Sequence, residues 1–492
     1  PNSFTDKAID KYYLRSVKNS LFGLFAVSYK KILYLDATIR RDASSTLPEQ
    51  NNTYAYPSLS GSFIFSDAIK SLPSFISFGK LRASAAEVGS DTRPYALGLL
   101  YELYPFTFNG VPSGRIAGST IPNSKLKPTR TRSFEAGLNM RFLQSRLGFD
   151  FTYYTSRSRD QINTVPAPQS SGFATQIVNV GSISNRGFEF VADAKILANT
   201  AVKWNMQVNA ARNRNNVESL AEGIPFLTLS SARWLGVTVV AMKGMPYGTI
   251  LGYDFKRDPD GNIILDAATR RPVQTDERQV LGNGTFDWTG GVTNSLAYRN
   301  FSLSLGIDIK QGADMFSMTN LYSVARGNDM STLEGRDAWN QSEIDRVAAG
   351  MTATEWFNSG NQKGFIPKGV IETTGTNGEK IYVPNDRAIS PARYWEGYII
   401  DGQGVASPFI YDASYIKVRD LAISYRLGRS VVNSLGLSDV RIGIVARNPF
   451  IIKKNVPNID PDSNTYNGNG QGLELGSLPQ RRSFGINLEV KF

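Results

Sequence analysis

The sequence of 492 residues contains neither cysteine nor histidine. Without cysteine there are no disulfides, no thiolate metal sites and no cysteine nucleophiles. Without histidine the chain lacks the commonest general base at neutral pH and the commonest zinc ligand, which excludes histidine-dependent triads and zinc hydrolase sites. We therefore predict that the protein is not an enzyme, and we assign it no catalytic residue, no metal site and no cofactor.

Long hydrophobic runs are also absent. No apolar run approaches the roughly 18 to 20 residues that a membrane-spanning helix needs, so any passage through a membrane must use β-strands. The formal net charge is +11, which might suggest a nucleic-acid ligand. The basic residues, however, are scattered through alternating segments and loops rather than gathered in a basic helix or compact run. We predict no binding of nucleic acid.

What the sequence does contain is alternation of apolar and polar residues. In segment 484–492 the polar row carries both charge signs, and the apolar row consists of Phe484, Ile486, Leu488, Val490 and Phe492. Such a strand suits a position between lipid on one side and a wet lumen on the other. We expect the apolar row, with its terminal aromatic residue, to act as a signal for barrel assembly.

The same alternation recurs along the whole chain. It predicts thirteen strands of about 11 to 15 residues, long enough to cross a tilted bilayer. The predicted strands are 18–30, 32–43, 57–67, 76–89, 131–143, 146–159, 183–197, 201–214, 287–298, 300–312, 414–428, 438–450 and 482–492.

Short and long connections alternate between these strands, if 68–75 and 429–437 count as short. This is typical of an all-β, transmembrane, antiparallel up-and-down β-barrel with short periplasmic turns and long extracellular loops. We therefore expect segments 215–286 and 313–413 to be extracellular loops. Bacterial single-chain barrels close with an even number of strands. Since thirteen is odd and the chain starts at Pro1 without a signal peptide, we expect 1–492 to be the C-terminal part of a longer barrel.

The loops hold the candidate contact residues. Their large aromatic side chains can stack on a sugar, clamp a peptide or meet a partner protein, or else pack the loop's own core. These candidates are Trp339, Trp356, Tyr382, Tyr394 and Trp395.

Three loop motifs resemble ligand sites but lack the required context. The acidic runs at 258–262 and 460–464 have carboxylates at alternate positions, but neither has the glycine and distal glutamate of a calcium loop at the required offsets. We interpret both as ordinary turns. The glycine-rich run at 467–472 has no following lysine and no strand-to-helix context, so we interpret it as a loop.

Several stretches together resemble the SusC/RagA family of TonB-dependent outer-membrane transporters of Bacteroidetes-type bacteria. They follow the family's order and span nearly the whole chain. The stretches are LYLDATIRRDASS (33–45), YPSLSGSFIFSD (56–67), KLRASAAEVGS (80–90), SSGFATQIVNVGSISNRGFEF (170–190), SYIKVRDLAISYRL (414–427), ARNPFIIKKNVPNIDPD (446–462) and RRSFGINLEVKF (481–492).

The resemblance implies a barrel of roughly 22 strands around a plug, with the plug, the early strands and the TonB-contacting segment outside this sequence. It also implies active import of an oligosaccharide or oligopeptide across the outer membrane. The implied partners are a SusD-like surface lipoprotein acting as a lid and the TonB complex. Three alternatives stay open: a barrel scaffold in a surface or secretion complex that transports nothing, a passive porin, and a soluble β-sandwich that binds carbohydrate.

Overall fold

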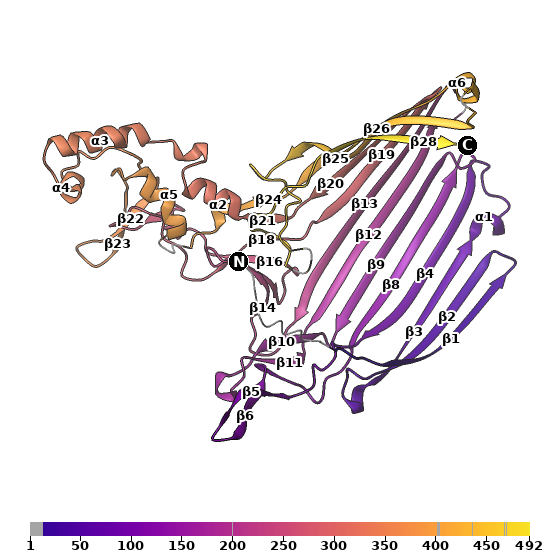
Figure 1. Cartoon of the computed structure of the whole chain (residues 1–492), viewed down its shortest axis with the longest axis horizontal. Coiled ribbons are helices and arrows are strands. Elements are labelled where there is room, and N and C mark those ends of the chain that lie inside the picture. The colour runs from indigo at the N-terminus through magenta and orange to yellow at the C-terminus, as the bar shows by residue number, and fades with distance from the viewer. Residues whose placement is uncertain (1–12, 199, 401–403, 435, 467, 469) are drawn as a thin grey trace. The chain divides into compact units, whose positions relative to one another are not determined.

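Thirteen strands form one antiparallel sheet, and their order in the sheet follows their order in the chain (Figure 1). The computed structural model describes residues 13–198, 200–400, 404–434, 436–466, 468 and 470–492. The strands are β1 (Lys18–Tyr29), β2 (Leu33–Ser44), β3 (Thr53–Ile64), β4 (Ile76–Ser90), β8 (Thr129–Phe142), β9 (Leu147–Arg159), β12 (Ser182–Leu197), β13 (Val202–Ser219), β19 (Trp288–Tyr298), β20 (Phe301–Gln311), β25 (Tyr415–Arg426), β26 (Asp439–Lys454) and β28 (Ser483–Lys491).

The predicted number and order of strands are confirmed. Most boundaries agree with the prediction to within two residues, and larger differences occur in β3, in β13 and in β26, which runs four residues further than predicted, to Lys454. Strand β3 begins at Thr53 and ends at Ile64, because the alternation continues upstream through Tyr54 and the short helix α1 (Phe65–Ala68) takes over downstream. Strand β13 runs five residues further than predicted, to Ser219. The connection 65–75 is consequently longer than 45–52, so the strict alternation of short and long connections fails at this one pair.

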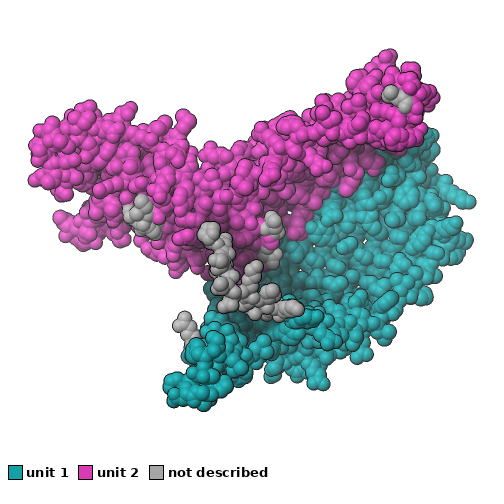
Figure 2. Space-filling model, in the orientation of Figure 1, with its two compact units in different colours: residues 1–190, 215–225 teal, residues 191–214, 226–492 magenta. Residues whose placement is uncertain are grey.

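The chain divides into two compact units (Figure 2). One contains residues 1–190 and 215–225, and the other contains 191–214 and 226–492.

In the first unit, the strand register places apolar side chains on one face of the sheet and polar ones on the other. Leu81 of β4 pairs with Leu138 of β8, and its neighbour Arg82 pairs with Gly137. Paired residues of antiparallel strands lie on the same face. Leu81 is 49% exposed, so the apolar row is not covered by any other layer of the unit. Such a surface requires apolar surroundings.

The longer connections of the first unit form small structures of their own. Strands β5 (Leu100–Phe108) and β6 (Val111–Ala117) make a hairpin. A second sheet has the order β10 (Ile162–Pro166), β11 (Thr175–Asn179), β7 (Thr120–Ile121). The described core of these connections is made by Leu47, Tyr54, Leu126 and Ile177. The remaining short elements of the unit are η1 (Glu49–Asn51) and η2 (Gln169–Ser171).

In the second unit, the long connections contain most of the helices. The elements before β25 are β14 (Phe226–Ser231), β15 (Thr238–Met242), β16 (Thr249–Gly252), β17 (Ile264–Leu265), β18 (Gln279–Asn283), β21 (Asp314–Ser317), α2 (Met318–Ala325), η3 (Met330–Thr332), α3 (Arg336–Ala348), α4 (Ala353–Asn358), β22 (Val370–Thr374), β23 (Lys380–Pro384), α5 (Pro391–Ile400), η4 (Ser407–Phe409) and β24 (Ile410–Asp412). Later in the chain come α6 (Arg429–Ser434) and β27 (Leu473–Glu474). Among the described residues, no helix has the length and hydrophobicity needed to span a membrane.

The tight turns adopt left-handed backbone conformations without glycine. Between β1 and β2, Lys30 and Lys31 have φ values of 48° and 59°, and the Ile32 amide donates to the Tyr29 carbonyl at 2.9 Å. Two successive positive φ angles are the signature of a type I′ hairpin turn, whose twist matches that of the strands. The short connection predicted between strands 18–30 and 32–43 is therefore confirmed.

Candidate functional site

Three long connections of the second unit share a hydrophobic core. We call residues 226–286, 313–413 and 455–481 the loop domain. The core combines side chains from all three segments. Its buried members are Val237, Val239, Ile250, Phe316, Leu321, Tyr398, Val405, Ala406, Phe409 and Leu473. Sequence reasoning treated 215–286 and 313–413 as separate loops and did not anticipate this shared core.

Small sheets and a buried carboxylate join the segments further. Strand β21 pairs with β24 on one side and with β27 on the other, and β17 pairs with β22. The carboxylate of Glu474 is fully buried and accepts hydrogen bonds from the hydroxyls of Ser317 and Thr319, both at 2.8 Å, and from the Thr319 amide at 3.1 Å. A buried carboxylate is tolerated only when such donors replace water.

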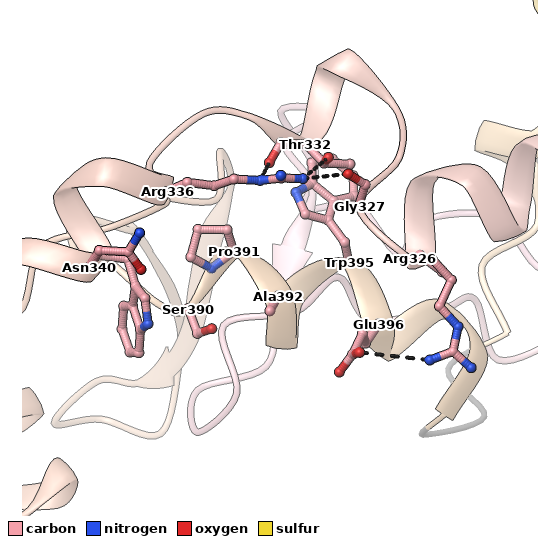
Figure 3. A pocket seen from close by; sticks show the side chains of 12 residues that line it. Arg326, Gly327, Thr332, Arg336, Asn340, Ser390, Pro391, Ala392, Trp395 and Glu396 are labelled. Atoms are coloured by element: carbon pink, nitrogen blue, oxygen red, sulfur yellow. Dashed lines mark hydrogen bonds and ion pairs between the residues drawn. The ribbon is translucent and has the colours of Figure 1, made fainter. Parts of the chain in front are cut away.

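The helices of the loop domain enclose a cavity of about 410 Å³ (Figure 3). It is formed by the end of α2, one face of α3 and the first turns of α5. Its lining includes two of the predicted contact residues, Trp339 and Trp395, together with Arg326, Arg336, Asn340, Ser390 and Glu396. A third predicted residue, Tyr394, packs beside the cavity, with its ring 4.8 Å from that of Trp395. Burial raises the pKa of Tyr394 above its usual value, so it remains a neutral phenol.

The other two predicted residues lie elsewhere. Trp356 is 8% exposed, and its indole N–H donates to the Ser342 hydroxyl at 2.9 Å, which makes it part of the packing between α3 and α4. Tyr382 lies on β23, with its hydroxyl 3.4 Å from a carboxylate oxygen of Glu372. A role for these two residues in contacting cargo or a partner stays a prediction.

An ion network ties segment 455–481 to the polar face of the sheet. Lys417 of β25 is 1% exposed, and its ammonium lies 2.7 Å from Asp460 and 3.2 Å from Asp462. The guanidinium of Arg419 lies 2.6 Å from both Asp462 and Asp308. The buried Tyr415 hydroxyl is within hydrogen-bond distance of Asp308 and Asp462, and donates to one of them at a time. Because the charges are paired and hydrogen-bonded, their burial is tolerated.

Sequence reasoning interpreted Asp460 and Asp462 as turn residues and missed their cationic partners. Both carboxylates do belong to a turn, since the Asp462 amide donates to Asp460 at 3.1 Å. Burial alone would raise the pKa of Asp462, but the Tyr415 hydrogen bond and the nearby cations outweigh it and leave the pKa below its ordinary value of 3.8. Among the described residues, no group of acidic side chains is arranged to hold a metal ion.

A bulge in β25 aims the cations at these carboxylates. The register against β20 shifts so that Gly306 pairs with Asp420 and Ile307 with Val418, leaving Arg419 as an extra residue. Such a bulge reverses which face successive side chains occupy. The sequence carries a signal for it, because the apolar row occupies even positions at Ile416 and Val418 but odd positions from Leu421 onward. The strand predicted at 414–428 thus contains a bulge that the strand assignment did not include.

The polar face in the first unit carries a more open ion pair. Arg82 of β4 reaches over Gly137 of β8 to Asp150 of β9, at 2.8 Å. A β-carbon at Gly137 would lie 2.6 Å from the Arg82 Nε atom, so only glycine leaves this path clear. Asn139 also donates to Asp150, at 2.7 Å. Both charged side chains are about one-third exposed, which fits a wet surface.

The predicted assembly row lies along β28. Ile486 and Leu488 pair with Ile444 and Ile442 of β26, and all four side chains are exposed. Phe492 is 94% exposed. The row is therefore available to an apolar partner, and its role in assembly stays a prediction.

Comparison with known proteins decides the family. The family described as TonB dependent receptor-like, beta-barrel, matches residues 2–308, more than half of the chain. The chain belongs to this family. As a TonB-dependent receptor barrel, the protein resides in the outer membrane, with its exposed apolar rows toward lipid and its polar rows toward the lumen. Family membership excludes the soluble β-sandwich.

Individual relatives match over almost the whole chain. It is 26% identical to TonB-dependent receptor P3 of Formosa agariphila, over 96% of this chain and 45% of that protein. It is 21% identical to TonB-dependent receptor SusC of Bacteroides thetaiotaomicron, over 98% of this chain and 44% of that protein. The chain thus spans about half the length of these relatives. The structure of the RagAB peptide transporter superposes with a TM-score of 0.69 at 18% identity, covering 97% of this chain and 48% of that one.

Proposed function

We propose that this TonB-dependent receptor barrel imports a sizeable nutrient, an oligosaccharide or an oligopeptide, across the outer membrane. In this proposal it works as a SusC-like transporter with a SusD-like surface lipoprotein as its lid, and the TonB complex supplies the energy. The plug, the TonB-contacting segment and the other strands of a barrel of roughly 22 strands lie outside these 492 residues.

The observation that carries the proposal is the loop domain. Its three segments enclose one core and a cavity with aromatic and polar walls, and ligand sites commonly have this mixture. Segment 455–481 is also anchored to the lumenal face through Lys417 and Arg419. We infer that the loop domain lies on the extracellular side, where it meets the lid and part of the cargo, and that the polar lumen conducts the cargo inward.

The test is an excision inside 313–413 in the native host. Removing all of 313–413 would destroy the shared core, because Phe316 and Phe409 belong to it. Removing 328–389 keeps α2 and α5, and a flexible glycine-serine linker joins Gly327 to Ser390, which line the same cavity. We expect normal membrane insertion by surface labelling, with loss of lid association or of uptake of labelled oligosaccharides and oligopeptides.

The matched control shortens only the turn 375–379 between β22 and β23, which leaves the core and the cavity intact. We expect uptake close to the unmodified level. Unchanged uptake and lid binding after the larger excision would refute the assignment, as would import that continues without the TonB complex. Surface display with no transport of any cargo would support the scaffold alternative instead.

A further inference from the structure

The outer, lipid-facing side of β8 and β9, which are neighbours in the sheet (Figure 1), changes from apolar to basic near one end. Alternate residues of a strand lie on the same face, so the paired residues Leu138 and Phe151 mark the outer rows of the two strands. Both rows reach an aromatic residue, Phe134 in β8 and Tyr153 in β9, and beyond it each row finishes with two arginines at the same end of the sheet. These arginines are Arg130 and Arg132 in β8 and Arg157 and Arg159 in β9.

This basic end of the sheet is the one that carries the long extracellular connections. The short turn at 143–146 joins β8 to β9 at the opposite end, and the connections 91–128 and 160–181 leave from the end with the arginines. A basic row on the outer face at this level lies where the hydrocarbon of the outer leaflet meets the lipid headgroups. Tyr153 fits the aromatic girdle that flanks such a boundary.

The arginines lie opposite one another across the two strands. Arg130 pairs with Arg159, and Arg132 pairs with Arg157. Like charges directly opposite each other destabilise a sheet unless anions offset them. Glu87 of β4 offsets part of the charge, because its carboxylate accepts hydrogen bonds from Arg130 at 2.7 Å and from Arg132 at 2.6 Å.

The basic surface continues beyond these pairs. Glu218 lies 2.5 Å from Arg157 and offsets its charge. Arg186 extends the surface to β12, because Phe188, two residues further on, stacks on the outer row of β9. Among the residues that the structure describes, Arg159 and Arg186 are exposed and have no bonded partner. Their charge is complementary to an anionic group from outside this unit.

The free guanidinium of Arg159 lines a hollow of about 310 Å³ on the β12 side of the cluster. Arg157 and Ser182 belong to the same wall, and the Arg157 Nε atom donates to the Ser182 hydroxyl at 3.3 Å. The exposed Asp160 is the acidic member of this wall. Three carboxylates thus stand against five arginines on the whole surface, so positive charge predominates.

An apolar hollow of about 410 Å³ lies next to Arg132 on the other side of the cluster. Leu59 of β3, Ala85 of β4 and Phe134 of β8 are paired across three neighbouring strands. The small side chain of Ala85 leaves space between its larger neighbours, and Pro57 adds a further apolar wall. A hydrocarbon chain can lie in this hollow with its headgroup at the arginines.

From these observations we propose that this outer surface binds a phosphorylated lipid of the outer leaflet. Phosphate oxygens accept hydrogen bonds from Arg132, Arg157 and Arg159, because guanidinium groups suit bidentate phosphate contacts. An acyl chain occupies the hollow beside Ala85. Two features identify a lipid rather than a free anion: the arginines continue the lipid-facing row, and the adjoining hollow has apolar walls. The inference goes beyond the proposed import function and does not depend on it.

The test measures lipid binding by native mass spectrometry of the purified whole protein in detergent. The probes, each at the same concentration, are diphosphoryl lipid A, a neutral monogalactosyl diacylglycerol and inorganic phosphate. We expect lipid A to bind at least about tenfold more tightly than the neutral glycolipid, and inorganic phosphate not to displace it. Equal binding of the neutral glycolipid, or displacement of lipid A by inorganic phosphate, would overturn the inference.

The variants separate the headgroup from the chain. Arg132→Gln and Arg157→Gln should each weaken lipid A binding by about tenfold, because each removes a charged donor. Ala85→Phe, at an exposed position, fills the apolar hollow and should weaken binding by about three- to tenfold. The matched control is Arg82→Gln, which removes the same charge from the polar face of β4 and should leave binding within about twofold.

Glu87→Gln distinguishes a binding role of the arginines from a purely structural one. The variant removes the carboxylate that occupies Arg130 and Arg132, so lipid A should bind about two- to fivefold more tightly. Weaker binding would show that the arginines serve only the sheet, and would overturn the inference. Unchanged lipid binding in Arg132→Gln and Arg157→Gln would do the same, including the case in which these variants lose a copurifying protein instead.

Discussion

The sheet and the loop domain bury their apolar residues in opposite ways. Ile444 on β26 is 64% exposed on the outer face of the sheet, whereas Phe316 and Leu321 in the loop domain are fully buried. The sheet depends on lipid to cover its apolar rows, and main-chain hydrogen bonds between neighbouring strands satisfy its polar backbone. The loop domain depends on a core of its own, like a water-soluble protein. One chain thus combines a region whose apolar residues are covered by lipid with a region whose apolar residues are buried in a protein core.

The largest expected effect comes from a mutation that removes a large side chain from the hydrophobic core of the loop domain. Phe316→Ala should destabilise the loop domain by about 3–5 kcal/mol, because it removes a fully buried ring. Protease should then cleave the loop domain while the strands keep their heat-resistant, folded mobility on gels. Leu81→Ala on the outer face is the comparison variant and should leave the loops resistant. Equal protease sensitivity of the two variants would show that the regions do not differ as described.

The next largest effect is expected from the buried ion network at Lys417, compared with the more exposed pair of Arg82 and Asp150. Lys417→Met leaves Asp460 and Asp462 without their buried cation and should weaken docking of segment 455–481 by about 3 kcal/mol. Arg82→Met removes a pair that is about one-third exposed and should cost about 1 kcal/mol or less. Amide hydrogen exchange in 455–481 and in β9 measures both. This ranking would be reversed if Arg82→Met increased the exchange rate in β9 by more than Lys417→Met increased it in 455–481.

A smaller effect is expected from acid. Because the pKa of Asp462 is lowered in the folded state, its contribution to stability is fully present above the ordinary value of 3.8 and is lost as the pH falls through the folded value. Docking of 455–481 should therefore be constant near neutral pH and weaken only below about 4. Asp462→Asn should remove most of this dependence. An unchanged acid transition in that variant would assign the dependence to other groups.

The smallest expected effect concerns assembly. If the apolar row of β28 is the assembly signal, Phe492→Ala should lower the amount of protein inserted in the membrane. It should not change the stability of the inserted fraction, because Phe492 is 94% exposed. Quantitative blotting of outer membranes measures the amount inserted, and thermal unfolding measures the stability of the inserted protein. Leu478→Ala, at a similarly exposed apolar residue of the 455–481 segment, is the matched control, and equal insertion of both variants would contradict the assignment.

The sequence was sufficient to predict the sheet because a membrane strand has a local signal. A period of two in hydrophobicity located all thirteen strands, with boundary errors where a short helix or a longer strand followed. Even the bulge at Arg419 has a local signal in the sequence, because the apolar residues change from even to odd positions between Val418 and Leu421. These features need only neighbours along the chain to be recognised.

The loop domain has no such signal. Its core joins Ile250, Phe316 and Leu473, which are far apart in sequence and lie in segments without a regular period. Aromatic content drew attention to Trp339 and Trp395, which line the cavity. It did not separate them from Trp356, whose indole is bonded to Ser342. That distinction depends on which helices meet, and only the folded structure contains it.

The shared core also sets a limit on how such a surface can be altered. Since Val237, Phe409 and Leu473 come from three different connections, replacing one connection by that of a distant homologue would leave mismatched halves of a single interior. Chimaeras that exchange all three together, with the anchoring residues Lys417 and Arg419 kept on the recipient strand, preserve every interior contact. Recombination of cargo preference between such proteins is thus expected to proceed by blocks of loops rather than loop by loop.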